Sequence, residues 1–168
     1  MKSIIYFILL AVLTLNTSYG QDKKPLSPEE TVTGSIDGND IKIVYCRPSA
    51  RGREMIGGKE PYGEVWRTGA NAATTIEFDK AAKIEGKDLP AGKYELFTIP
   101  GENEWVIIFQ KYGKQWGHYS YKKENDVLRV TVKPQKISDF VETFTISINK
   151  SAVNLKWENT SVSFNVKS

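Results

Sequence analysis

Apolar and polar residues alternate with a period of two along most of the chain after residue 30, which is typical of β-strands that bury one face. Residues 41–46 show the pattern, with Ile41, Ile43 and Tyr45 on one face of the expected strand. The other segments with this alternation, or with a short apolar run, are 74–78, 93–99, 105–109, 127–132, 144–148, 153–157 and 162–166. No long segment shows the apolar periodicity of an amphipathic helix.

Turn-forming residues separate the expected strands. The turn segments are 37–40, 85–87, 90–92, 100–103 and 125–126, which are rich in Gly, Pro, Asn and Asp. About nine or ten short strands with frequent turns predict an all-β fold, an antiparallel β-sandwich of two packed sheets. A closed β-barrel is the alternative, because strand order cannot be read from spacing.

The first twenty residues differ from the rest of the chain. A single charge at Lys2 precedes an apolar run from Ile4 to Leu15, and small residues follow at Ser18 and Gly20. The run is about a dozen residues long, shorter than a spanning helix, so it predicts a cleavable signal peptide at residues 1–20. We expect an exported protein, periplasmic or secreted, with no stable membrane insertion after cleavage.

The polar residues 21–30, with two prolines, are expected to form a flexible leader. Residues 31–168 are then expected to form a single β-rich domain. Removing residues 1–20 leaves 148 residues, with 22 basic and 20 acidic side chains. With so small an excess of positive charge, the protein has no strong electrostatic attraction for polyanions, so we expect no nucleic-acid partner.

The chain has one cysteine, Cys46, and one histidine, His118. It therefore lacks an internal disulfide and the Cys/His set that a zinc site requires. No phosphate-binding glycine loop or dinucleotide fingerprint occurs in the sequence, and we expect neither a metal nor a cofactor.

Residues 47–73 interrupt the alternation with five glycines, two prolines and four arginines. Long irregular segments between strands are often functional. The arginines of this segment, which can hold a carboxylate or phosphate in two-point contact, are Arg47, Arg51, Arg53 and Arg67. The alternative is that Glu54, Glu60 and Glu64 neutralise them in surface ion pairs.

Two further groups of residues are candidate ligand contacts. Trp66, Arg67 and Asn71 precede the strand 74–78 and could form a pocket, unless Trp66 fills the core and the polar pair satisfies loop carbonyls. Residues 115–121 combine aromatic and polar side chains, as in surfaces that stack on sugars. The alternative is an aromatic-rich strand or loop in which every second ring is buried. His118, in this second group, is also a candidate general base, but no partner for it can be placed from sequence.

Three motifs give the chain a resemblance to a known family. They are RPSARGR at residues 47–53, GEVWRTGANAATT at 63–75 and LPAGKYELFTIP at 89–100. With these motifs the chain resembles a family of exported bacterial proteins, domain of unknown function number twenty-nine eleven, over residues 41–166. The resemblance implies export and a single β-rich domain.

Three functions remain open from the sequence. The first is an exported domain that binds an anionic or sugar-like small molecule through Arg47, Arg51, Arg53, Arg67 and Asn71, with Trp66 stacking on it and His118 nearby. The second is an envelope hydrolase in which His118 works with a carboxylate. The third is a structural or interaction module that binds an envelope protein.

Overall fold

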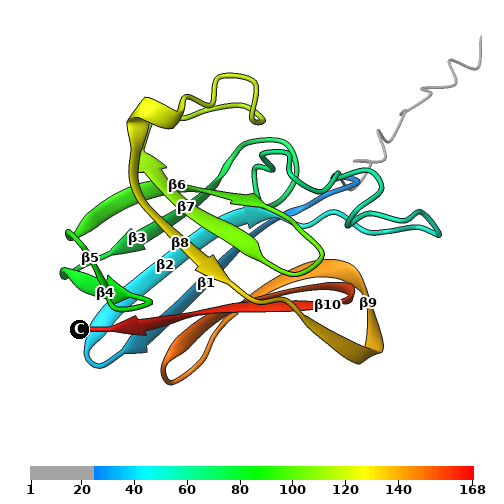
Figure 1. Cartoon of the computed structure of the whole chain (residues 1–168). Helices are drawn as coiled ribbons and strands as arrows, with labels where there is room; N and C mark the ends of the chain where they lie inside the picture. Colours follow the sequence, from blue (N-terminus) through cyan, green and yellow to red (C-terminus); the bar gives the residue numbers. More distant parts are fainter. Residues whose placement is uncertain (1–24) are drawn as a thin grey trace, which may run out of the picture.

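The structure of the protein is a computed structural model, which describes residues 25–168 (Figure 1). The predicted signal peptide, residues 1–20, and residues 21–24 of the predicted leader lie outside the described residues. The described part of the chain holds ten β-strands and one short 3-10 helix, η1 (Lys123–Asn125). Within residues 25–168, no helix has the length and apolarity needed to cross a membrane.

The strands form two antiparallel sheets that enclose a common core. The six-stranded sheet has the order β1-β2-β3-β6-β7-β8. Its strands are β1 (Glu29–Ile36), β2 (Asn39–Cys46), β3 (Thr74–Phe78), β6 (Gly92–Ile99), β7 (Trp105–Lys111) and β8 (Asp126–Val132). The four-stranded sheet has the order β5-β4-β10-β9. Its strands are β4 (Ala82–Ile84), β5 (Lys87–Leu89), β9 (Gln135–Ile148) and β10 (Ala152–Lys167).

All pairings between neighbouring strands are antiparallel in both sheets. The predicted antiparallel β-sandwich is therefore confirmed. The alternative of one closed barrel is wrong for residues 25–168, since their strands form two separate sheets.

The largest boundary differences from the expectation are at β1, β9 and β10. β9 begins at Gln135, nine residues before the expected segment 144–148. β1 begins at Glu29, so the last two residues of the leader predicted for 21–30 belong to the sheet rather than to a flexible segment.

The segments 153–157 and 162–166, expected as separate strands, are parts of the single 16-residue strand β10. Between them Glu158 has a φ of 50°, and pairing with β9 shifts register on both sides of it. Such a bulge bends a strand without ending it.

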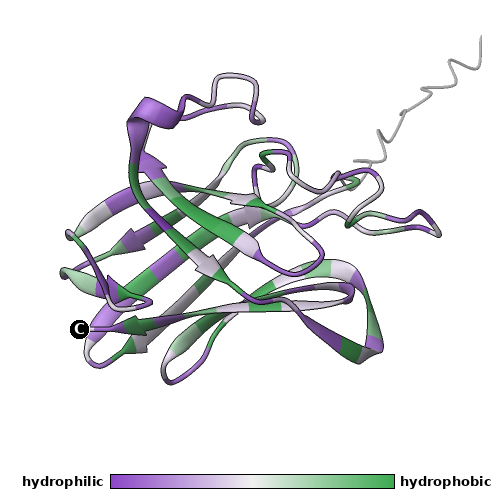
Figure 2. Cartoon of the chain, viewed as in Figure 1, coloured by the Kyte–Doolittle hydropathy of each residue, from purple (hydrophilic) through white to green (hydrophobic). Residues whose placement is uncertain are grey.

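The core lies between the sheets and is built from the apolar faces that the alternation predicted. Figure 2 shows hydrophobic and hydrophilic residues alternating along most of the strands. Four large aromatic residues meet in it, namely Trp66, Trp105, Phe144 and Trp157. The Trp66 indole stacks on Trp157 with ring centroids 5.6 Å apart and meets the ring of Phe144 at 4.9 Å. The irregular segment 47–73 therefore contributes directly to the core.

The six-stranded sheet also buries part of its outer face, along β6 and β7. Phe97 and Ile108 form a second apolar cluster there with Ala73. Val65 of the irregular segment and Tyr121 of the loop 112–122 pack against this cluster. Because β7 is covered on both faces, residues 105–109 form a continuous apolar run rather than an alternating one.

Candidate functional site

Residues 65–73, the end of the irregular segment, lie beside the loop 112–122 between β7 and β8, over the outer face of the six-stranded sheet. The Ala73 N–H donates to the Gln115 carbonyl and the Gly117 N–H donates to the Asn71 carbonyl, each at 3.0 Å. These two hydrogen bonds fix the position of the loop that carries His118.

A buried side chain of the sheet, Glu95, also holds this loop in place through hydrogen bonds. Glu95 on β6 is fully buried, and its oxygens accept from the Gln115 backbone N–H (2.6 Å) and from Gln115 Nε2 (2.5 Å). Gln115 Nε2 also donates to Gln110 Oε1 at 2.6 Å. A buried polar group is stable only when hydrogen-bonded, so the bonds to Glu95 hold the loop in one position.

A pocket of about 220 Å³ opens where the two segments meet. We call it the Glu60 pocket. Its lining residues are Lys59, Glu60, Pro61, Glu64, Val65, Trp66 and His118. Every one of them except His118 comes from the irregular segment, so the pocket exists only because the loop 112–122 folds against that segment.

Two of the groups that line the pocket, Glu60 and His118, have shifted pKa values. Burial raises the pKa of Glu60 to about 7, although the nearby positive charge of Arg67 opposes the rise. Burial, and then Arg67, lower the pKa of His118, while Glu64 opposes this change. The pKa of the Glu60 carboxyl therefore lies above the pKa of the His118 imidazole. Near pH 7 a fraction of the Glu60 carboxyl groups is protonated, while most His118 side chains are neutral. Such pairs are typical of binding and catalytic sites.

Two buried nitrogens beside the pocket lack hydrogen-bond partners. They are Nε of Arg67 and Nδ1 of His118. The Arg67 guanidinium lies close to the loop, since a Cβ atom at Gly117 would be 3.8 Å from its Nη1. Residues 25–168 contain five unpaired buried side-chain atoms in all, and these two lie together beside the pocket. Since buried polar groups are nearly always satisfied in folded proteins, their proximity makes this place a candidate site for a ligand or water.

The other three predicted arginines do not join Arg67. Arg47 ties the strands together, because its guanidinium donates to the Phe144 carbonyl (3.1 Å) and Thr145 Oγ1 (2.8 Å) and pairs with Glu30. Arg51 Nη2 donates to the Leu26 carbonyl at 2.7 Å.

Arg53 donates to the carbonyls of Ser49 and Ala50, both at 2.9 Å. The predicted cluster of four arginines is therefore not formed, because backbone carbonyls hold three of them apart. The alternative is also not seen in the described residues, where no arginine forms an ion pair with Glu54, Glu60 or Glu64.

Trp66 cannot stack on a ligand in this structure, because only 1% of it is exposed and its ring belongs to the core. Its Nε1–H donates to the Gly69 carbonyl at 3.0 Å, which satisfies the indole inside the fold. The stacking role expected for Trp66 is corrected accordingly. Asn71 is exposed and has a φ of 58°. Its carbonyl accepts from the Gly117 N–H, and its Nδ2 donates to the Ser27 carbonyl at 3.4 Å.

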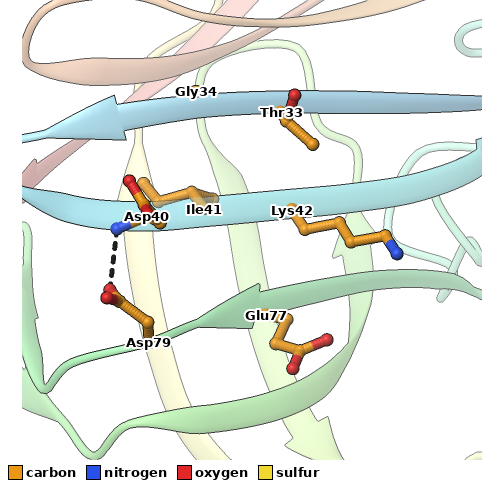
Figure 3. A pocket seen from close by; sticks show the side chains of 7 residues that line it. All are labelled: Thr33, Gly34, Asp40, Ile41, Lys42, Glu77 and Asp79. Atoms are coloured by element: carbon orange, nitrogen blue, oxygen red, sulfur yellow. Dashed lines mark hydrogen bonds between the residues drawn. The ribbon is translucent and has the colours of Figure 1, made fainter.

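A larger hollow of about 580 Å³ lies over β1, β2 and β3 (Figure 3). Lys42 and Glu77 extend there from adjacent strands, and Asp79 accepts a hydrogen bond from the Asp40 N–H at 2.7 Å. None of its lining residues has a buried polar atom without a partner. Across residues 25–168, no group of three or more His, Cys, Asp or Glu side chains is placed to hold a metal ion. The Glu60 pocket is therefore the stronger candidate.

Of the residues that the sequence predicted as ligand contacts, His118 lines the Glu60 pocket and Arg67 lies beside it, whereas Glu60 was not among them. Glu60 entered the sequence analysis only as a surface charge that could neutralise an arginine. Its one signal was its place in the irregular segment, seven residues before Arg67.

Comparison with known proteins identifies a family and nothing further. No curated protein and no solved structure matches the chain. The family model DUF2911, described as a protein of unknown function, matches residues 27–166. This match covers nearly all of the two-sheet sandwich, including the irregular segment and the loop 112–122. The chain therefore belongs to the DUF2911 family.

Proposed function

We propose that the chain binds a small molecule carrying an anionic group at the Glu60 pocket. The observation that carries this proposal is the pair of unpaired buried nitrogens, Arg67 Nε and His118 Nδ1, beside one pocket. Leaving such a group unpaired costs about 1–3 kcal/mol, and a ligand oxygen would remove that cost. Export to the periplasm or the medium, expected from residues 1–20, would make this an extracytoplasmic binding protein.

The charges of the pocket favour an anion. Lys59 and Arg67 are positive and Glu64 is negative, so one positive charge is in excess while Glu60 is protonated. Glu60 cancels that excess as it ionises around pH 7. Anion binding and Glu60 protonation should therefore strengthen each other, as linkage requires.

The direct test is replacement of Arg67 by glutamine. We expect Arg67→Gln to weaken binding of sulfate, acetate or an acidic sugar at pH 6 by about 10- to 100-fold, because a charge-assisted hydrogen bond contributes about 1.5–3 kcal/mol. Isothermal titration calorimetry on the purified protein measures the change.

Arg53→Gln is the matched control for this test. Among residues 25–168, the Arg53 side chain hydrogen-bonds only to the Ser49 and Ala50 carbonyls, so its replacement should leave the affinity within about twofold. Equal losses in the two variants, or no anion binding by the unaltered protein, would refute the proposed site.

A hydrolase is the second candidate, favoured by the raised pKa of Glu60 beside the lowered pKa of His118. In such a reaction the oxygen of a water molecule bonds to the electrophilic carbon while His118 takes its proton. The bond to the leaving oxygen breaks, and Glu60 supplies the proton which that oxygen needs. The starting state returns when His118 releases its proton to water and Glu60 takes one from water.

Turnover distinguishes the hydrolase from a binding protein. A hydrolase should cleave esters or glycosides of the ligands that bind, and both His118→Asn and Glu60→Gln should lower kcat by about 100-fold or more. Tight binding without any turnover of the corresponding ester or glycoside would leave the binding protein as the function and remove the hydrolase.

A further inference from the structure

We infer that the ligand is an acidic sugar, whose carboxylate binds beside Arg67 and whose ring stacks on the aromatic side chains of Trp116 and Tyr119. This inference rests on the proposed function and names the class of ligand. It depends on three features of the loop 112–122, which are the exposure of its aromatic rings, the rigidity of its backbone and its place beside the Glu60 pocket.

The exposure of Trp116 is unusual for this protein. Of the four tryptophans in the chain, Trp66, Trp105 and Trp157 are buried in the core, whereas 68% of Trp116 is exposed. Tyr119 is 80% exposed in the same loop. Neighbouring exposed aromatic rings mark an interaction surface, because each leaves a large apolar area in contact with water.

The backbone that presents these rings is held in place. The Gly117 N–H donates to the Asn71 carbonyl. The Gln115 carbonyl accepts from the Ala73 N–H, and the Gln115 N–H donates to the buried Glu95. Gly117 has a φ of 72°, and a Cβ atom there would lie 2.9 Å from the Tyr119 ring. Glycine is therefore needed both for the backbone conformation and for the close approach of Tyr119. A ligand that stacks on this loop does not have to order it first.

The rings flank a residue that lines the pocket. His118 lies between Trp116 and Tyr119 in the chain, and its imidazole is 4.9 Å from the Tyr119 ring, centroid to centroid, at an interplanar angle of 32°. Because the Tyr119 ring lies against His118, a ligand with one end in the Glu60 pocket can cover Tyr119 with its remaining part. Trp116, two residues before His118, is the other exposed ring of the same loop. At about 220 Å³ the pocket is smaller than most ligand sites, so it holds only one end of such a molecule.

An acidic sugar matches all of these groups. Its carboxylate pairs with Arg67, its hydroxyls exchange hydrogen bonds with Lys59, Glu60 and Glu64, and the apolar face of its ring covers an aromatic side chain. An inorganic anion would leave the aromatic rings exposed. A purely apolar molecule would leave the polar groups of the pocket unpaired.

The test uses calorimetry on the purified protein at pH 6, with oligosaccharides of galacturonic acid as probes. Their methyl esters are matched neutral probes, and sulfate is the small-anion probe. We expect the acidic oligosaccharide to bind at least about 10-fold more tightly than its methyl ester, since esterification removes the charge that Arg67 would pair with.

Variants separate stacking from anion binding. Trp116→Ala and Tyr119→Ala should each weaken oligosaccharide binding by about 5- to 20-fold while leaving sulfate binding unchanged. Phe140→Ala is the control, because Phe140 is 56% exposed but lies on β9, outside the loop 112–122. It should change neither affinity.

Each outcome bears on one of the two proposals. Oligosaccharide binding that depends on charge, Trp116 and Tyr119 supports the inference. Sulfate binding that Arg67→Gln abolishes, without any saccharide binding, overturns the sugar and leaves the proposed function intact. Recruitment of an envelope protein through Trp116, again without saccharide binding, also overturns it. Failure of every anion to bind overturns both.

Discussion

Trp66→Ala is expected to lower the free energy of unfolding by about 4 kcal/mol, within the range for removing a large aromatic residue from a core. The Trp66 indole contacts the rings of Trp105, Phe144 and Trp157, so its removal would leave a cavity lined by aromatic groups from both sheets. It would also leave the Gly69 carbonyl without its donor. We expect the irregular segment to loosen, which would weaken anion binding as well.

Urea unfolding followed by circular dichroism measures this change. Trp116→Ala is the matched control, because Trp116 is exposed and should alter stability by no more than about 0.5 kcal/mol. If the two tryptophan variants are equally stable, Trp66 does not pack as described and its role as a ligand-stacking residue reopens.

Glu60→Gln is expected to stabilise the protein by about 2–3 kcal/mol at pH 8 and to have almost no effect on stability near pH 4. The pKa of Glu60 rises from its ordinary value of 4.5 to about 7 on folding, because the carboxyl group is buried. The folded state therefore binds a proton more tightly than the unfolded state. The unaltered protein loses stability as pH rises from about 4.5 to 7, and the glutamine variant, which has no proton to lose, does not.

The measurement is the urea midpoint and slope of both proteins between pH 4 and pH 8. Glu102→Gln serves as the control, since Glu102 is exposed in the turn between β6 and β7. Its difference from the unaltered protein should stay within about 0.5 kcal/mol across the range. A Glu60→Gln difference that does not vary with pH would show that Glu60 is not buried as described.

The fold was largely predictable because the alternation of apolar residues reports the faces of strands. The prediction failed at β10, where Glu158 in a left-handed conformation makes a bulge that looks like a strand end in the sequence. β1 and residues 135–143 of β9 were also missed. So were the strands β4 and β5, since three residues are too few for a period of two to be seen.

The candidate site was only partly predictable. Arg67 and His118 were candidates because of their residue types, and the structure brings them together. Nothing in the sequence indicated that Arg47, Arg51 and Arg53 hydrogen-bond to backbone carbonyls instead. The burial of Trp66 depends on partners 39 to 91 residues further along the chain, at Trp105 and Trp157. The shifted pKa of Glu60 arises only when the irregular segment folds, so no local pattern encodes it.

The most direct test of the central claim, that the Glu60 pocket binds an anion, is a carbon-13 NMR titration of the Glu60 carboxyl group with and without sulfate. We expect a midpoint near pH 7 without sulfate, and a higher midpoint at saturating sulfate, because the anion favours the protonated carboxyl. The shift should disappear in Arg67→Gln. A midpoint near 4.5 that sulfate leaves unchanged would contradict both the burial of Glu60 and the assignment of the pocket as an anion site.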